Sequence, residues 1–138
     1  MDINDLILSD EALNVIDNGT WVDDFPEAPG LGLYVVGLNS EAAQNATRHK
    51  MQVQRGKNRG RPLSDDQLAT ITKEVLVDVV LKDWRGLKAN GQDVKYSKEQ
   101  AKQWIMSRKG ERFTSLVLQA AQRVDSEASE FVEEATKN

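Results

Sequence analysis

Cysteine is absent from this sequence of 138 residues, and histidine occurs once. Without cysteine the chain has no disulfide, no thiolate nucleophile and no cysteine-based zinc site. A single imidazole excludes every metal site that needs two. A Ser-His-Asp triad would have to use His49, whose neighbours Arg48 and Lys50 disfavour the imidazolium that the triad must form. We therefore expect no catalytic residue, no metal site, no cofactor and no enzymatic activity.

Long hydrophobic runs are also absent. The most apolar stretch, residues 75–81, is interrupted by Asp78 and falls far short of the roughly 18 residues that span a bilayer. The N-terminus, MDINDLILSD, is acidic and lacks the basic start and the small-residue cleavage site of a secretory signal. We expect a protein of the cytoplasm with no membrane partner.

Charge is distributed in blocks along the chain. Residues 1–47 carry nine acids and no Lys or Arg, whereas residues 48–61 carry six bases and no acid. Residues 62–124 have eleven bases and eight acids, and residues 125–138 have five acids and one base. Such blocks indicate an interaction protein, or self-association between acidic and basic surfaces. Each block taken alone also fits a solvated surface.

The length fits a single domain over residues 1–138. Its first part, residues 1–39, is expected to hold a short helix and a β arm. Ser9 is a natural N-cap for this helix, and Gly19 follows its end. Extended apolar segments around Trp21 and over residues 33–38 then predict a small antiparallel pair.

The second part, residues 40–138, is predicted to be a helical core. Ser40 caps a helix to about residue 54, whose thin apolar face needs a partner, and a mobile basic linker follows. A capping box at Ser64 opens the clearest helix, and periodic apolar residues carry it to about residue 83. The fold class is therefore mainly α (α+β), with about five helices and a small N-terminal β-hairpin or extended arm. The basic linker spans residues 55–62, and two further helices are expected over residues 97–107 and 110–134.

The basic stretch supports an alternative function in DNA binding. Arg59-Gly60-Arg61-Pro62 matches the core of an AT-hook, which lays arginines into the narrow minor groove of A·T-rich DNA. Four residues are a weak signal, and this tetrapeptide directly precedes a capped helix, which argues against a nucleic-acid partner. The candidate nucleic-acid-binding residues are Arg55, Lys57, Arg59 and Arg61.

Trp84 lies where the predicted central helix ends. Four residues are close enough in sequence to cluster there: Trp84, Leu87, Tyr96 and Trp104. Asn90-Gly91 favours a tight turn that folds residues 85–95 back as a hairpin or loop. Gly86 would allow a positive φ or a close approach of the loop. We interpret the stretch as an aromatic plug between two helices.

These residues resemble the tail assembly chaperones of long, non-contractile-tailed (lambda-like) bacteriophages. Both share a Trp-x-Gly segment, a polar turn containing glycine, an aromatic-Ser helix start and a strand like LYVVGLNS upstream. The resemblance covers roughly residues 31–138. The matching positions are Trp84, Gly86, Leu87, Gly91, Tyr96, Ser97 and Trp104.

The resemblance implies a non-enzymatic role in the host cytoplasm. Such chaperones bind and solubilise the long, helical tape measure protein and help to recruit tail tube subunits during tail morphogenesis. The expected partners are therefore the tape measure protein, the tail tube protein and further copies of the chain as a homo-oligomer. Several amphipathic helices are consistent with binding a helical client.

Overall fold

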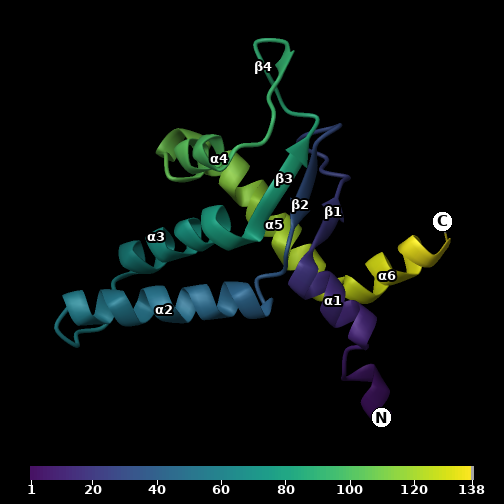
Figure 1. The fold of residues 1–138 in the computed structure, drawn as a ribbon, viewed down its shortest axis with the longest axis horizontal. Coiled ribbons are helices and arrows are strands. Elements are labelled where there is room, and N and C mark those ends of the chain that lie inside the picture. The colour runs from purple at the N-terminus through teal and green to yellow at the C-terminus, as the bar shows by residue number, and fades with distance from the viewer. Residues whose placement is uncertain (138) are drawn as a thin grey trace.

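The computed structural model describes residues 1–137 and has an α+β fold that is mainly helical (Figure 1). This confirms the predicted fold class, with six α-helices in the described part. The helices are α1 (Asp10–Asn18), α2 (Glu41–Lys57), α3 (Asp65–Val75), α4 (Lys98–Ile105), α5 (Glu111–Ser126) and α6 (Ala128–Lys137). The strands are β1 (Thr20–Val22), β2 (Gly32–Val35), β3 (Leu81–Arg85), β4 (Lys88–Ala89) and β5 (Gln92–Asp93).

The N-terminal part contains the predicted helix and strand pair. The Ser9 hydroxyl accepts a hydrogen bond from the backbone N–H of Ala12 at 3.1 Å and caps α1. Strands β1 and β2 pair antiparallel, with Trp21 opposite Tyr34, and β3 joins the free side of β2. The small sheet therefore has the order β1-β2-β3.

The predicted central helix over residues 64–83 is wrong in its second half. The α-helix ends at Val75, a wider π-helical turn covers Leu76–Val80, and Leu81–Arg85 form a strand. In this strand Trp84 pairs with Leu33, and the preceding Val80 carbonyl accepts a hydrogen bond from the N–H of Val36 at 3.0 Å. Pairing with β2 satisfies the backbone of Leu81–Arg85 as a strand, so non-local contacts override the helical periodicity there.

Helices α2 and α3 lie side by side, run in opposite directions and are joined by a short turn (Figure 1). The helix predicted to end near residue 54 continues to Lys57, so the first three residues of the expected linker are helical. Asn58 and Gln67 exchange two amide hydrogen bonds, of 2.9 and 3.0 Å, across the remaining turn. Gln67 also completes the predicted capping box with Ser64. The turn is thus held by its own side chains.

The C-terminal helix predicted over residues 110–134 is two helices. Helix α5 ends at Ser126, and Glu127, at φ −117°, separates it from α6. Helix α5 packs against β1 and β2, whereas α6 turns aside and packs along α1. The break allows one apolar stripe to cover two different partners. Its buried residues are Leu116, Val117, Ala120, Ala121, Val124 and Ala128.

Asp125 ties the C-terminal half of the chain to the start of α2. Its carboxylate accepts hydrogen bonds from the backbone N–H groups of Leu38 and Asn39 at 3.0 and 3.1 Å. Burial raises the pKa of the Asp125 carboxyl, although these two N–H groups act to lower it. This contact fixes the direction in which α2 leaves the sheet.

The elements radiate from the sheet rather than forming a compact ball. In Figure 1 the α2–α3 pair extends to one side, the β4–β5 hairpin projects upward, and both termini lie on the side opposite the tip of α2. Long projecting elements leave much of their surface without an intramolecular partner. These uncovered surfaces are the candidate functional sites of the molecule.

Candidate protein-binding surfaces

The structure brings the predicted aromatic residues together. Trp84 is 4% exposed, and its ring centroid lies 4.9 Å from that of Tyr96 and 5.3 Å from that of Trp104. Phe113 of α5 closes the cluster at 5.9 Å from Trp84. The Trp84 indole N–H donates to the carbonyl of Val94 at 2.8 Å, so its polar atom is satisfied. With a buried ring and a bonded N–H, Trp84 is a packing residue.

The remaining residues of the motif shape the connection between β3 and α4. Asn90 and Gly91 both have positive φ, of 53° and 81°, and turn the β4–β5 hairpin. Gly86 has a φ of 75°, and a Cβ there would overlap the carbonyl oxygen of Gly30. Half-buried Leu87 closes the hairpin through its carbonyl, and Ser97 caps α4. The motif positions therefore act on the fold and present no reactive group.

The four candidate nucleic-acid-binding residues lie at the tip of the α2–α3 pair, and all are exposed. Arg55 and Lys57 belong to the last turns of α2. Arg59 and Gly60 have positive φ values of 56° and 82°, so the Arg-Gly-Arg-Pro segment bends sharply. An arm lying in a minor groove is extended, so this conformation does not favour the DNA alternative. The tip nevertheless concentrates positive charge.

Closer to the sheet, ion pairs join α2 to α3 and to the π-helical turn that follows α3. The Lys50 ammonium lies 3.1 Å from a carboxylate oxygen of Glu74 and 3.2 Å from one of Asp78. Burial lowers the pKa of Lys50, but the hydrogen bonds and charges of the two carboxylates raise it above its ordinary value. The positive charge of Lys50 is therefore compensated by carboxylates of the fold. The charge of the surrounding surface is set by neighbouring side chains.

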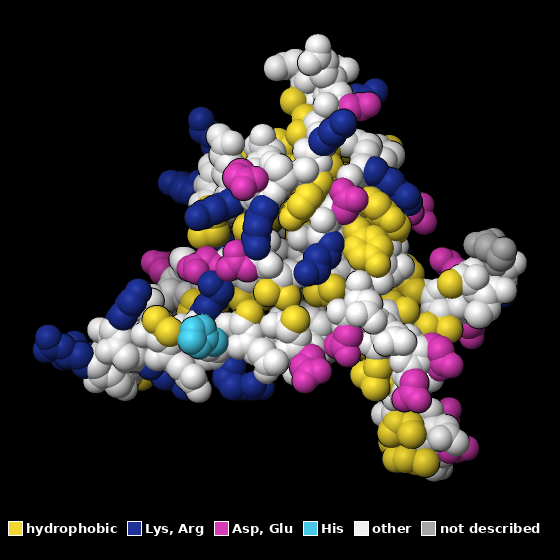
Figure 2. All heavy atoms as spheres, in the orientation of Figure 1, with side chains coloured by type: hydrophobic (Ala, Val, Ile, Leu, Met, Phe, Trp, Pro, Cys, Tyr) yellow, Lys and Arg dark blue, Asp and Glu magenta, His cyan; other side chains and the backbone are white. Residues whose placement is uncertain are grey.

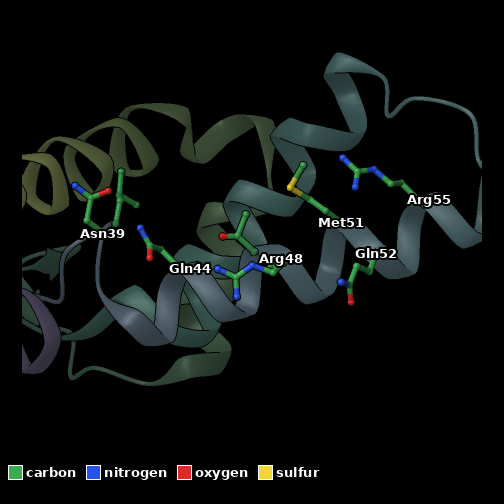
Figure 3. A pocket seen from close by; sticks show the side chains of 8 residues that line it. Asn39, Gln44, Arg48, Met51, Gln52 and Arg55 are labelled. Atoms are coloured by element: carbon green, nitrogen blue, oxygen red, sulfur yellow. The ribbon is translucent and has the colours of Figure 1, made fainter.

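The opposite side of α2 borders an open groove of about 580 Å³ (Figure 3). Figure 3 shows side chains from successive turns of α2 along it. Ala43 is the one residue of α2 that is buried, so this helix contributes little to the core. The α2 groove is lined by Leu38, Asn39, Gln44, Thr47, Arg48, Met51, Gln52 and Arg55, which include two bases and no acid. A groove of this kind suits an acidic segment with apolar side chains.

The N-terminal arm, residues 1–8, is the most apolar exposed segment. A short 3-10 turn over Ile3–Asp5 buries none of its residues. Ile3, Leu6 and Ile7 are 62%, 66% and 58% exposed. Packing within the fold does not explain why these side chains are apolar, because the fold does not cover them. Exposed apolar clusters of this kind mark interaction sites in soluble proteins.

The outer end of the α2–α3 pair and the N-terminal arm carry opposite charge. Figure 2 shows basic side chains at the outer end of the α2–α3 pair, and apolar and acidic side chains gathered together at the N-terminal end. Asp2 and Asp5 lie in the arm, and Asp10 and Glu11 follow in the first turn of α1. The block pattern of the sequence thus becomes two separate ends of the molecule.

Other kinds of site are not visible in residues 1–137. No group of three or more His, Asp or Glu side chains there is placed to hold a metal ion. Within the same residues no helix is long and apolar enough to cross a membrane. The candidate surfaces are therefore grooves and exposed patches.

Sequence reasoning missed three of these features. The charge pattern indicates only that the arm belongs to an acidic, solvated region, although Ile3, Leu6 and Ile7 are visible as an apolar group in the sequence. Phe113 lies in the helix predicted over residues 110–134, and nothing nearby in the sequence links it to the aromatic cluster. Asp125 gave no signal, because its partners lie 86 and 87 residues away.

The fold and its surfaces define a small, mainly helical α+β protein. The family model of the YdaY prophage protein matches residues 38–138, which is well over half of the chain. The chain therefore belongs to the YdaY prophage protein family, and its phage origin is supported. No match was found among curated proteins. None was found among solved structures either.

Proposed function

We propose that this prophage protein is a non-enzymatic tail assembly chaperone. In this role it binds and solubilises the tape measure protein and helps to recruit tail tube subunits. Three lines support the proposal: the family is of prophage origin, the motif around Trp84 resembles tail assembly chaperones, and the molecule exposes apolar surface. The exposed N-terminal arm is the observation that carries it.

The arm has the chemistry that a chaperone needs for an apolar helical client. Its large side chains are already in water, so covering each one with the client would contribute about 1.5–3 kcal/mol before the entropy of association is subtracted. Acidic Asp2 and Asp5 keep the segment hydrated between encounters. The apolar stripe of a client helix would lie against the arm, as in other recognition of amphipathic helices.

Co-expression with the tape measure protein of the same prophage tests the proposal. The wild-type chain is expected to move the client from the insoluble to the soluble fraction. The triple variant Ile3→Ser, Leu6→Ser and Ile7→Ser should lose this effect, because it removes the apolar contacts. Its melting temperature should stay unchanged, since the three side chains are exposed and surface substitutions change stability by about 0.5 kcal/mol or less.

Met106→Ser is the matched control. Met106 is also exposed but belongs to the end of α4, far along the chain from the arm. This variant should rescue the client as the wild type does. An insoluble client beside the wild-type chain would reject the chaperone role. Full rescue by the triple variant would reject the arm as the client surface.

A further inference from the structure

We propose that the N-terminal arm of one copy docks in the α2 groove of a second copy. The contact joins two different surfaces, so each copy offers an arm to one neighbour and a groove to another. Such a head-to-tail contact repeats and builds a ring or an open chain. The proposal concerns copies of this chain alone and does not depend on a client.

The arm needs a cover in the free protein. Its residues are exposed throughout, and its short turn is held by local hydrogen bonds such as that from the N–H of Leu6 to the carbonyl of Ile3 at 2.9 Å. Large apolar side chains left in water promote association. A specific docking site on a second copy turns this tendency into a defined contact.

The α2 groove complements the arm in charge and in polarity. Arg48 and Arg55 line the groove, and no acidic residue lies among its lining residues. The arm carries Asp2 and Asp5 and no base. Met51 and Leu38 supply apolar contact inside the groove. Acidic groups can therefore meet the two guanidinium groups while the apolar side chains of the arm cover Met51.

The two guanidinium groups are available for this contact. Arg48 donates one hydrogen bond, to the side chain of the neighbouring Asn45 at 3.0 Å. Within residues 1–137, the guanidinium of Arg55 makes no ion pair and no hydrogen bond, and only its backbone takes part in the helix and in a bond from the N–H of Gly60. Neither charge is neutralised by the fold, in contrast to Lys50.

The dimensions of arm and groove also agree. The rise of about 1.5 Å per residue places Gln44 and Arg55 about 16 Å apart along α2. Only Ile3–Asp5 of the arm form a 3-10 turn, and eight residues can reach up to about 26 Å when extended, so the arm is long enough to follow the groove. In Figure 1, α1 leads the N-terminus away from α2 of the same chain, so a neighbouring molecule is the natural recipient.

Self-association and client binding would then compete, because both use the arm. This consequence alone rests on the proposed function. It predicts that a soluble tape measure fragment dissociates the assembly. Experiments on the chain without client test the docking itself, so a failed client rescue and a failed docking are distinguishable.

Sedimentation velocity of the full chain, from micromolar to near-millimolar concentration at low salt, is the first test. The wild type is expected to grow beyond a monomer with concentration and to dissociate in high salt, since exposed charges are screened. Arg48→Glu with Arg55→Glu should weaken association at least tenfold. The matched control, Lys88→Glu with Lys95→Glu on the distant hairpin, changes the net charge equally and should leave association unchanged.

A charge-reversal mixture makes the test specific. The arm variant, Asp2→Lys with Asp5→Lys, should not associate alone, because its arm repels the arginines of the groove. Mixing it with the groove variant should restore association, since each arm then meets an oppositely charged groove. A wild type that stays monomeric at every concentration, a control that weakens like the groove variant, or a mixture that stays monomeric would each overturn the proposal.

Discussion

Replacing Trp84 with alanine tests whether the aromatic cluster holds the fold. Trp84 is 4% exposed and contacts three other rings, with centroids 4.9 to 5.9 Å away. Deleting a buried large aromatic costs about 3–5 kcal/mol, because burial is lost and a cavity remains. Proteins of this size have a free energy of unfolding of about 5–15 kcal/mol. The variant should therefore lose a large part of its stability.

Urea denaturation followed by far-ultraviolet circular dichroism measures this loss. For a urea m-value of about 2 kcal/mol per molar, a cost of about 4 kcal/mol lowers the midpoint by about 2 M. Dichroism is preferable to tryptophan fluorescence because the substitution removes one of three tryptophans. Trp84→Phe should cost less, since it keeps a ring and loses the hydrogen bond to Val94.

Trp21→Ala is the control for removing a tryptophan as such. Trp21 is half-buried, pairs edge-on with Tyr34 and lies 4.2 Å from the guanidinium of Arg85. Its loss should cost about 1–2 kcal/mol. A Trp84→Ala cost below about 1 kcal/mol with an unchanged m-value would refute the reasoning. Trp84 would then contribute little to packing despite its burial.

Three further predictions concern Gly86, Asp125 and the basic tip of the α2–α3 pair. Gly86→Ala should destabilise the fold by more than about 1 kcal/mol, because φ is positive and a Cβ would overlap the carbonyl of Gly30; an unchanged urea midpoint would contradict this. The raised pKa of Asp125 contributes stability that is present below its ordinary pKa of 3.8 and lost as pH rises through the raised value. Asp125→Asn should therefore cost more at acidic than at neutral pH, and equal costs in urea titrations at the two pH values would argue against the linkage. DNA binding tighter than micromolar at physiological salt is not expected in a fluorescence anisotropy assay; nanomolar, steeply salt-dependent binding that is lost in Arg59→Ala with Arg61→Ala would favour the DNA alternative.

The features that sequence reasoning predicted correctly are those set by local chemistry. Ser9 and Ser64 cap their helices because a hydroxyl near free N–H groups needs only the next few residues. Asn90-Gly91 turns the hairpin because both residues tolerate positive φ. The strand pair of β1 and β2 is likewise separated by only a short connection. Each of these depends on neighbours along the chain.

The wrong predictions all depend on partners that are distant in sequence. The run from Leu81 to Arg85 continues a helical apolar pattern, and only the presence of β2 makes it a strand. The break at Glu127 likewise appears because α6 packs on α1 and not on the sheet. Local periodicity cannot report a competing partner, so tertiary contacts decide both cases.

The candidate interaction surfaces are hard to predict for a different reason. An apolar residue such as Ile7 has the same appearance in sequence whether it is buried or exposed. The thin apolar face predicted for α2 did indicate that the helix needs a partner, and α3 covers one side of it. The groove on the other side becomes visible only when the fold shows which side α3 leaves open.

In our proposal, stability and interaction are carried by different residues. The family match begins at Leu38, the first lining residue of the groove, and it includes the aromatic cluster but not the arm. The matched part thus contains the Trp84 packing and the receiving surface, whereas the arm that we propose to dock there lies outside it. Because the arm buries nothing, it can change without a cost to folding. Substitutions in the cluster are expected to lower stability and, through it, any binding, so arm and groove variants with unchanged melting temperature are the ones that would isolate the proposed interaction.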